Sequence, residues 1–149
     1  MTAPLVATVE QRSTAGRPDD TVVVLRVANV SHSAIEVFNP DLGRPAPNEN
    51  WPWSTETYRA SLLMSYGYLT VAVFDDSGEQ VAREPIETWA TPVLPPPLTL
   101  GPGESFRLLI PVGLFFRLSY GQSYRVVAEY GDDALKVRAE GTIDSAGQD

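Results

Sequence analysis

The stretch Leu98–Tyr130, LTLGPGESFRLLIPVGLFFRLSYGQSYRVVAEY, decides the fold of this chain. Apolar residues alternate along it twice, at Phe106, Leu108, Ile110 and Val112, and again at Tyr124, Val126, Ala128 and Tyr130. Successive side chains of a strand point to opposite faces, so this alternation predicts two half-buried strands joined by a crossing connection. The rest of the chain is expected to form the sheets around them.

Similar patterns predict further strands, bounded by turns rich in glycine, proline and aspartate. They cover Leu5–Gln11, Thr21–Asn29, Ala34–Phe38, Tyr68–Phe74, Glu79–Arg83 and Leu135–Ile143. The β-branched run Thr21–Asn29 predicts a central strand covered on both faces, and its spacing from Ala34–Phe38 predicts an antiparallel hairpin. About seven to nine strands with little helix predict an all-β, two-sheet antiparallel sandwich. We expect a single domain over residues 1–149, with a frayed tail at 145–149.

Two long connections interrupt this rhythm. Within Asn39–Tyr66, Ser54 is placed to cap a short helix over Thr55–Tyr66 that ends at Gly67. A short strand at Leu62–Met64 is the alternative for the same segment. The second connection, Glu84–Pro97, contains three successive prolines, which favour extended geometry and predict a crossing from one sheet to the other.

Composition limits the possible functions of the chain. It has 149 residues, 43% of them hydrophobic and 20% charged, as in an ordinary folded protein. The net charge is −8 and Lys136 is the only lysine, so we expect no binding to nucleic acid. The absence of cysteine excludes disulfides and cysteine zinc sites. With no predicted signal peptide and no long apolar run, we expect no membrane insertion and a bacterial-type cytoplasmic location.

Two motifs in the decisive stretch resemble known domains. The pattern Leu118-x-x-Gly121-x-x-Tyr124 resembles the tyrosine corner of fibronectin type III and related immunoglobulin-like domains. The resemblance implies that the Tyr124 hydroxyl bonds to nearby backbone where the chain enters the penultimate strand. The turn LGPGE at 100–104 is similar to one that precedes the corresponding strand in many bacterial immunoglobulin-like domains. Together they imply an immunoglobulin-like sandwich.

A longer order of short motifs resembles the bacterial intracellular proteinase inhibitor domain. These motifs are Val27-x-Asn29-x-Ser31, Asp76-x-Gly78-x-x-Val81, Pro102-Gly103-Glu104 and Gly121-x-x-Tyr124. The resemblance implies proteinase inhibition as one alternative function. The chain departs from antibody domains because it has neither a strand tryptophan nor paired cysteines, and its Asn39–Tyr66 connection is long.

Residues able to support catalysis are few. His32, the only histidine, lies in a predicted turn between Ser31 and Ser33, which fits an exposed turn residue better than a general base. The acidic pairs Asp19-Asp20, Asp75-Asp76 and Asp132-Asp133 fit turn positions better than calcium ligands. We therefore expect no enzyme activity, no catalytic residues, no metal site and no cofactor.

Aromatic residues in the two long connections are the best functional candidates in the sequence. The expected partner-binding residues are Trp51, Trp53, Tyr58, Tyr66 and Trp89. Tryptophan and tyrosine contribute much of the energy of protein interfaces, and loops on rigid scaffolds often carry binding sites. A satellite core over a sheet edge is the other interpretation. We predict a non-enzymatic module that binds a protein partner or itself, with carbohydrate binding by Trp51, Trp53 and Trp89 as an alternative.

Overall fold

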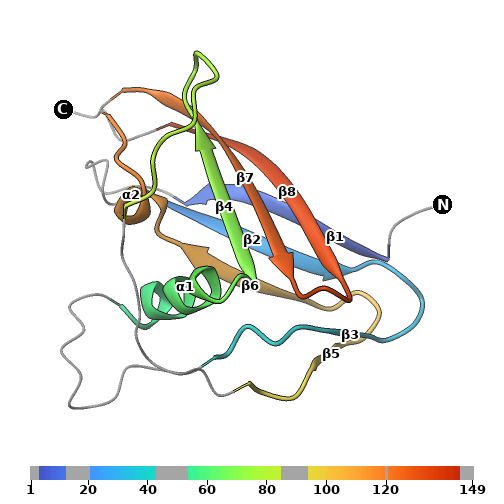
Figure 1. Cartoon of the computed structure of the whole chain (residues 1–149). Coiled ribbons are helices and arrows are strands. Elements are labelled where there is room, and N and C mark those ends of the chain that lie inside the picture. The colour runs from blue at the N-terminus through green and yellow to red at the C-terminus, as the bar shows by residue number, and fades with distance from the viewer. Residues whose placement is uncertain (1–3, 13–20, 43–53, 85–93, 120, 145–149) are drawn as a thin grey trace, which may run out of the picture.

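The computed structural model describes residues 4–12, 21–42, 54–84, 94–119 and 121–144 (Figure 1). The turn predicted at 13–20 and the tail predicted at 145–149 lie outside these ranges. The strands are β1 Leu5–Arg12, β2 Val22–Asn29, β3 Ile35–Val37, β4 Leu69–Phe74, β5 Leu98–Leu100, β6 Ser105–Ile110, β7 Ser123–Gly131 and β8 Lys136–Asp144. The helices are α1 Thr55–Ser65 and α2 Val112–Phe115. Within the described ranges, no helix is long and apolar enough to cross a membrane.

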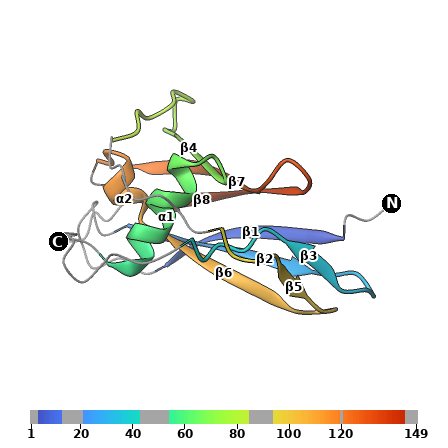
Figure 2. The ribbon, with the colours of Figure 1, turned by 60° about the horizontal axis from the view of Figure 1, so that its bottom comes forward.

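The strands form two main layers, as Figure 2 shows from the side. Sheet A has the order β1-β2-β6 and sheet C the order β4-β7-β8, and every pairing in them is antiparallel. A third sheet, B, is the two-stranded ribbon β3-β5 beside them. The predicted all-β sandwich with one short helix in the 54–66 connection is confirmed.

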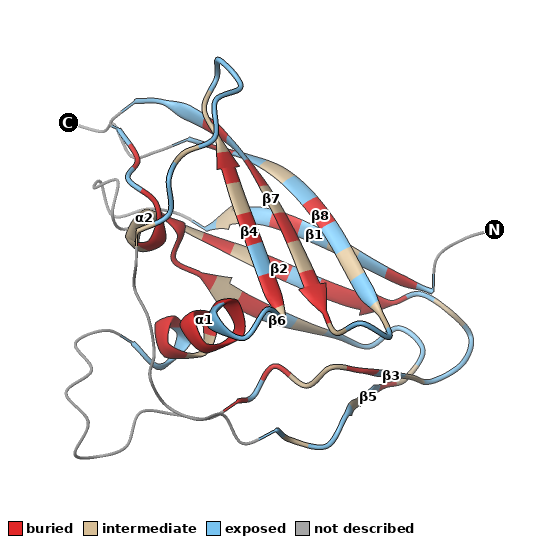
Figure 3. Cartoon of the chain, viewed as in Figure 1, coloured by how far each residue is buried: buried red, intermediate tan, exposed pale blue. Residues whose placement is uncertain are grey.

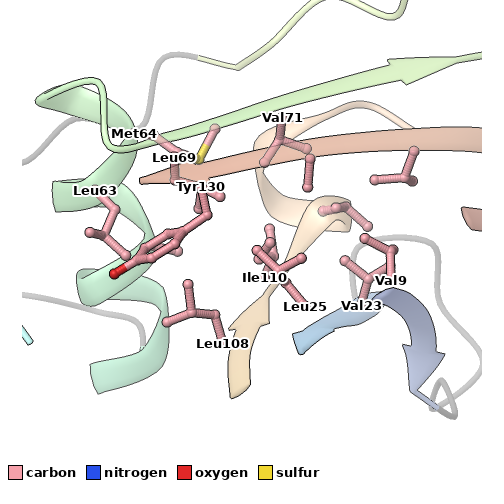
Figure 4. Close-up of a cluster of buried hydrophobic side chains, with 14 of the residues drawn as sticks. Val9, Val23, Leu25, Leu63, Met64, Leu69, Val71, Leu108, Ile110 and Tyr130 are labelled. Carbon is pink, nitrogen blue, oxygen red and sulfur yellow. The ribbon is translucent and has the colours of Figure 1, made fainter. Parts of the chain in front are cut away.

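The core lies between sheets A and C. The inward positions of the strands are buried and the outward positions are largely exposed, which gives the alternating colours of the strands in Figure 3. Leu25 and Ile110 from sheet A face Val71 and Tyr130 from sheet C in Figure 4. The predicted alternation of β6 and β7 is therefore present, except that Val112 belongs to α2, a turn of helix that the sequence did not predict.

Helix α1 closes one open side of the sandwich. It contacts edge strand β6 of sheet A and edge strand β4 of sheet C, and its apolar residues join the core (Figures 1 and 4). Ser54 caps it as predicted, since its side chain accepts a hydrogen bond from the Thr57 N–H at 3.1 Å. Gly67 follows with φ +83°, a conformation that favours glycine after a helix. Leu62–Met64 is therefore helical, and the alternative of a short strand is wrong.

On the opposite side of the sandwich, β1 and β8 lie against each other. Gly141 is so close to β1 that an added Cβ would stand 2.6 Å from the carbonyl oxygen of Val9. The side chain of Gln11 donates to the carbonyl of Asp144 at 2.6 Å and accepts from its N–H at 2.9 Å. These contacts join the two layers at this edge.

Two predictions about the strand Thr21–Asn29 are wrong. It is central in its sheet, but only one face is covered, since Arg26 is exposed and Val24 only half-buried. It also forms no hairpin with the following strand, because β3 pairs with β5 while β2 pairs with β1 and β6. Asn29, at the end of β2, bonds its side chain to the next turn and to the carbonyl of Leu100, which directs the chain out of sheet A.

The structure also differs from the sequence prediction over Glu79–Arg83, where a strand was expected. The expected turn is present, because the Asp75 carboxylate accepts from the Ser77 hydroxyl at 2.6 Å and from the Glu79 N–H at 2.9 Å. These bonds hold the pKa of Asp75 below its ordinary value. The segment after the turn forms only isolated bridges, Gln80 with Phe74 and Arg83 with Phe116.

The Leu118-x-x-Gly121-x-x-Tyr124 motif forms a corner at the start of β7. The Tyr124 hydroxyl accepts a hydrogen bond from the backbone N–H of Ser119 at 2.8 Å, which is the type of contact that the resemblance implies. The Tyr124 ring and Leu118 are both buried, and Gly121 turns the chain with φ +71°.

Tyr124→Phe is expected to lower the free energy of unfolding by about 1–1.5 kcal/mol, because it removes this hydrogen bond. Urea denaturation measures the change. Tyr68→Phe is the matched control, since the Tyr68 ring stacks on Phe38 with centroids 3.8 Å apart and phenylalanine preserves that stacking. Equal stability of Tyr124→Phe and the wild type would show that the corner hydroxyl contributes nothing.

Candidate functional site

The aromatic residues predicted to bind a partner do not form one surface in the described structure. Trp51, Trp53 and Trp89 lie outside the described residues. Tyr58 is only 2% exposed, so its assignment as a partner-binding residue is wrong, because it packs into the core from α1. Tyr66, at the end of the same helix, is 45% exposed.

The turn that contains His32 has a structural role. His32 is exposed, while the neighbouring Ser31 hydroxyl lies 2.8 Å from the Asn29 side-chain oxygen and 2.9 Å from the Ser33 carbonyl. Ser31 is thus part of the network around buried Asn29. Within the part of the chain that the structure describes, no group of three or more His, Asp or Glu side chains is placed to hold a metal ion.

The most distinctive surface is the outer face of sheet A. Strand register places its outward side chains in rows that run across β1, β2 and β6. Two successive rows are Thr8, Arg26 and Arg107, and then Glu10, Val24 and Leu109. Arg12 lies on the same face beyond Glu10, and Arg59 reaches its border from α1. We call the surface formed by Arg12, Arg26, Arg59 and Arg107 the arginine face.

Arg26 and Arg107 are direct cross-strand partners on this face. Directly opposed side chains have Cβ atoms about 4.5–5.5 Å apart, and two like charges in that position destabilise a sheet. Among the described residues, neither arginine forms an ion pair. Such a pair costs stability, and no carboxylate of the described residues offsets that cost by an ion pair with either arginine.

Two adjoining hollows cover the arginine face. One, of about 590 Å³, is lined by Arg12, Val24, Glu56, Arg59, Arg107 and Leu109. The other, of about 570 Å³, is lined by Thr8, Glu10, Val24, Arg26, Ser105, Phe106 and Arg107. They share Val24 and Arg107, so the arginines surround one continuous depression with half-buried apolar side chains in its floor.

The outer face of sheet C has a different charge arrangement. There Glu140 lies 3.3 Å from Arg125 and 3.0 Å from Arg138, and the Arg125 guanidinium stands 4.6 Å from the centre of the Phe74 ring. Glu129 is the direct cross-strand partner of Arg138. Arginines on sheet C are thus neutralised by neighbouring carboxylates, whereas Arg26 and Arg107 on sheet A face each other.

The chemistry of the arginine face suits the binding of anions. A guanidinium group presents planar N–H donors that match the two oxygens of a carboxylate or phosphate. Glu10 and Glu56 lie among the lining residues of the two hollows and reduce the positive charge there. Arginine around an apolar floor is also a common composition of protein interfaces.

Sequence reasoning missed this surface because its arginines are far apart along the chain, at positions 12, 26, 59 and 107. The one local signal is Arg26, which interrupts the apolar run of β2 at an outward position. Recognition of the cluster requires the β1-β2-β6 order, since only that order places Arg26 beside Arg107.

No protein-family model matches this chain, and no curated protein matches it in sequence.

Proposed function

We propose that this protein is a non-enzymatic binding module whose arginine face takes an acidic segment of a protein partner. The observation that carries the proposal is the opposed pair Arg26 and Arg107, two like charges held together without a carboxylate partner among the described residues. Negative charge from a partner would convert this repulsion into attraction and fix the register of the contact.

Carboxylates of a protein explain the face better than phosphates of a nucleic acid. The net charge of −8 repels a long polyanion, and Glu10 and Glu56 interrupt the positive region with negative charge. Half-buried Val24 and Leu109 between the arginines offer apolar contact area, which a peptide can use and a phosphate backbone cannot.

The proposal includes an immunoglobulin-like scaffold. Its support is the division of strands into β1-β2-β6 and β4-β7-β8 with a tyrosine corner at the start of β7, an arrangement similar to that of immunoglobulin sandwiches. The expected compartment remains the cytoplasm. Proteinase inhibition, and carbohydrate binding by Trp51, Trp53 and Trp89, stay predictions from the sequence alone.

Fluorescence anisotropy with a short, amidated, fluorescein-labelled peptide of alternating glutamate and leucine tests the proposal. The wild-type protein is expected to bind this peptide, and added salt should weaken binding because the attraction is between exposed charges. Arg26→Gln/Arg107→Gln is expected to bind at least about tenfold more weakly, since both central guanidinium groups are lost.

The matched control is Arg125→Gln/Arg138→Gln, which removes the same charge from the outer face of sheet C and should leave the affinity unchanged. An equal loss of affinity in both double variants would show that only net charge matters. Tighter binding of a fluorescein-labelled single-stranded oligonucleotide than of the peptide would also overturn the proposal, since it would identify phosphate as the preferred anion.

A further inference from the structure

The hollow between α1 and sheet A gathers three guanidinium groups from three separate elements. Arg12 comes from β1, Arg107 from β6 and Arg59 from α1, and the hollow measures about 590 Å³. Among the described residues that line it, Glu56 is the one carboxylate, and Val24 and Leu109 supply apolar surface. The lining of the site thus combines guanidinium groups with apolar side chains.

Arg59 is held in this hollow with an unused donor. Its Nε atom is shielded from solvent and has no hydrogen-bond partner among the residues that the structure describes. A buried donor without a partner destabilises a protein. Burial and the negative charge of Asp132 raise the pKa of the Tyr130 hydroxyl, and the positive charge of Arg59 acts in the opposite direction. Arg59 is therefore close enough to the core to influence Tyr130.

The position of Arg59 is set by the structure around it. Arg59 lies on α1, whose N-terminus is capped by Ser54. The nearby helix residues Tyr58, Ala60 and Ser61 are buried and hold the helix against the core. The guanidinium group is therefore presented from a rigid element rather than from a loop. Rigid presentation lowers the entropy that a binding contact must overcome.

We propose that this hollow is the anchoring site of the interaction, and that it takes a carboxylate carried next to an apolar side chain. The inference rests on the proposed function and names the group that the partner inserts. A carboxylate accepts from planar guanidinium donors, and Arg12, Arg59 and Arg107 bring three such groups to the lining of this hollow. The apolar neighbour then packs on Val24 and Leu109.

Two kinds of polypeptide carry this chemistry, and two probes distinguish them. An aspartate or glutamate side chain beside leucine is represented by the amidated glutamate–leucine peptide. A terminal carboxylate is represented by a fluorescein-labelled peptide of glycine and serine that ends in leucine, compared with its C-terminal amide. A volume of about 590 Å³ lies within the range of ordinary ligand sites and is adequate for one such group.

The decisive variant is Arg59→Lys, which keeps the charge but removes the planar pair of donors. We expect it to bind the preferred probe at least about tenfold more weakly than the wild type, with Arg59→Met no better. Lys136→Met, which removes a cation from the opposite sheet, should bind like the wild type. Circular dichroism and urea denaturation establish that each variant is folded.

The outcomes separate this inference from the proposed function. If Arg59→Lys binds as tightly as the wild type while Arg26→Gln/Arg107→Gln does not, the arginine face binds partners but the hollow is not its anchor. If neither probe binds the wild-type protein, both proposals are overturned. Retention of full affinity by the glycine–serine peptide after amidation would rule out the terminal carboxylate as the recognised group.

Discussion

Asn29→Ala is expected to lower the free energy of unfolding by about 3 kcal/mol or more, the largest effect of any single truncation that we predict. Asn29 is 0% exposed. Its Nδ2 donates to the carbonyls of Ser33 and Leu100, both at 2.8 Å, and its Oδ1 lies 2.9 Å from the Ser31 N–H and 2.8 Å from the Ser31 hydroxyl. Alanine removes all four contacts, and it takes away the partner of the Leu100 carbonyl at a buried position that water reaches poorly.

Urea denaturation of Asn29→Ala against the wild type measures this effect, with Asn39→Ala as the matched control. Asn39 also bonds through both side-chain atoms, to the Pro96 carbonyl at 3.2 Å and to the Asp41 N–H at 3.0 Å, but these bonds are exposed. The control is expected to lose less than about 1 kcal/mol, because water replaces exposed bonds. Equal losses at the two positions would contradict a special role for Asn29.

The contacts of Asn29 show why only part of the fold could be predicted from the sequence. Alternation along β6 and β7, the Ser54 cap and Gly67 after α1 are local signals, and the predictions based on them agree with the structure. The hairpin of β2 with β3 was the natural local expectation. That expectation is wrong: the Asn29 side chain bonds to the carbonyl of Leu100, 71 positions away. A prediction from the spacing of neighbouring segments cannot include a contact between residues so far apart.

The candidate site was less predictable than the fold. Alternation alone places Arg26 and Arg107 on outward faces, but it does not state that the two strands are neighbours. Exposed arginines are common, so each one by itself signals nothing. The functional signal is a juxtaposition of like charges, which arises only from sheet order and register. The tryptophans that seemed more informative in the sequence lie outside the described residues.

Arg107→Glu is expected to raise stability and to weaken binding strongly, a combination that distinguishes a functional residue from a structural one. The substitution replaces the opposed like charges of Arg26 and Arg107 with an opposite-charge pair, which should add about 0.2–1 kcal/mol to the free energy of unfolding. The same change places a carboxylate in the floor of both hollows. Affinity for the glutamate–leucine peptide should fall by about a hundredfold, equivalent to about 2.8 kcal/mol.

Arg138→Glu is the matched control for this charge reversal, since Arg138 is also an outward arginine at a directly paired strand position. Its neighbours are Glu140 at 3.0 Å and the cross-strand partner Glu129, so reversal there creates repulsion and should lower stability while leaving peptide affinity unchanged. Opposite signs of the stability change on the two sheets would follow directly from their different charge arrangements. If Arg107→Glu destabilised the protein as Arg138→Glu does, the Arg26–Arg107 pair would carry no stored repulsion, and the observation behind the binding proposal would be lost.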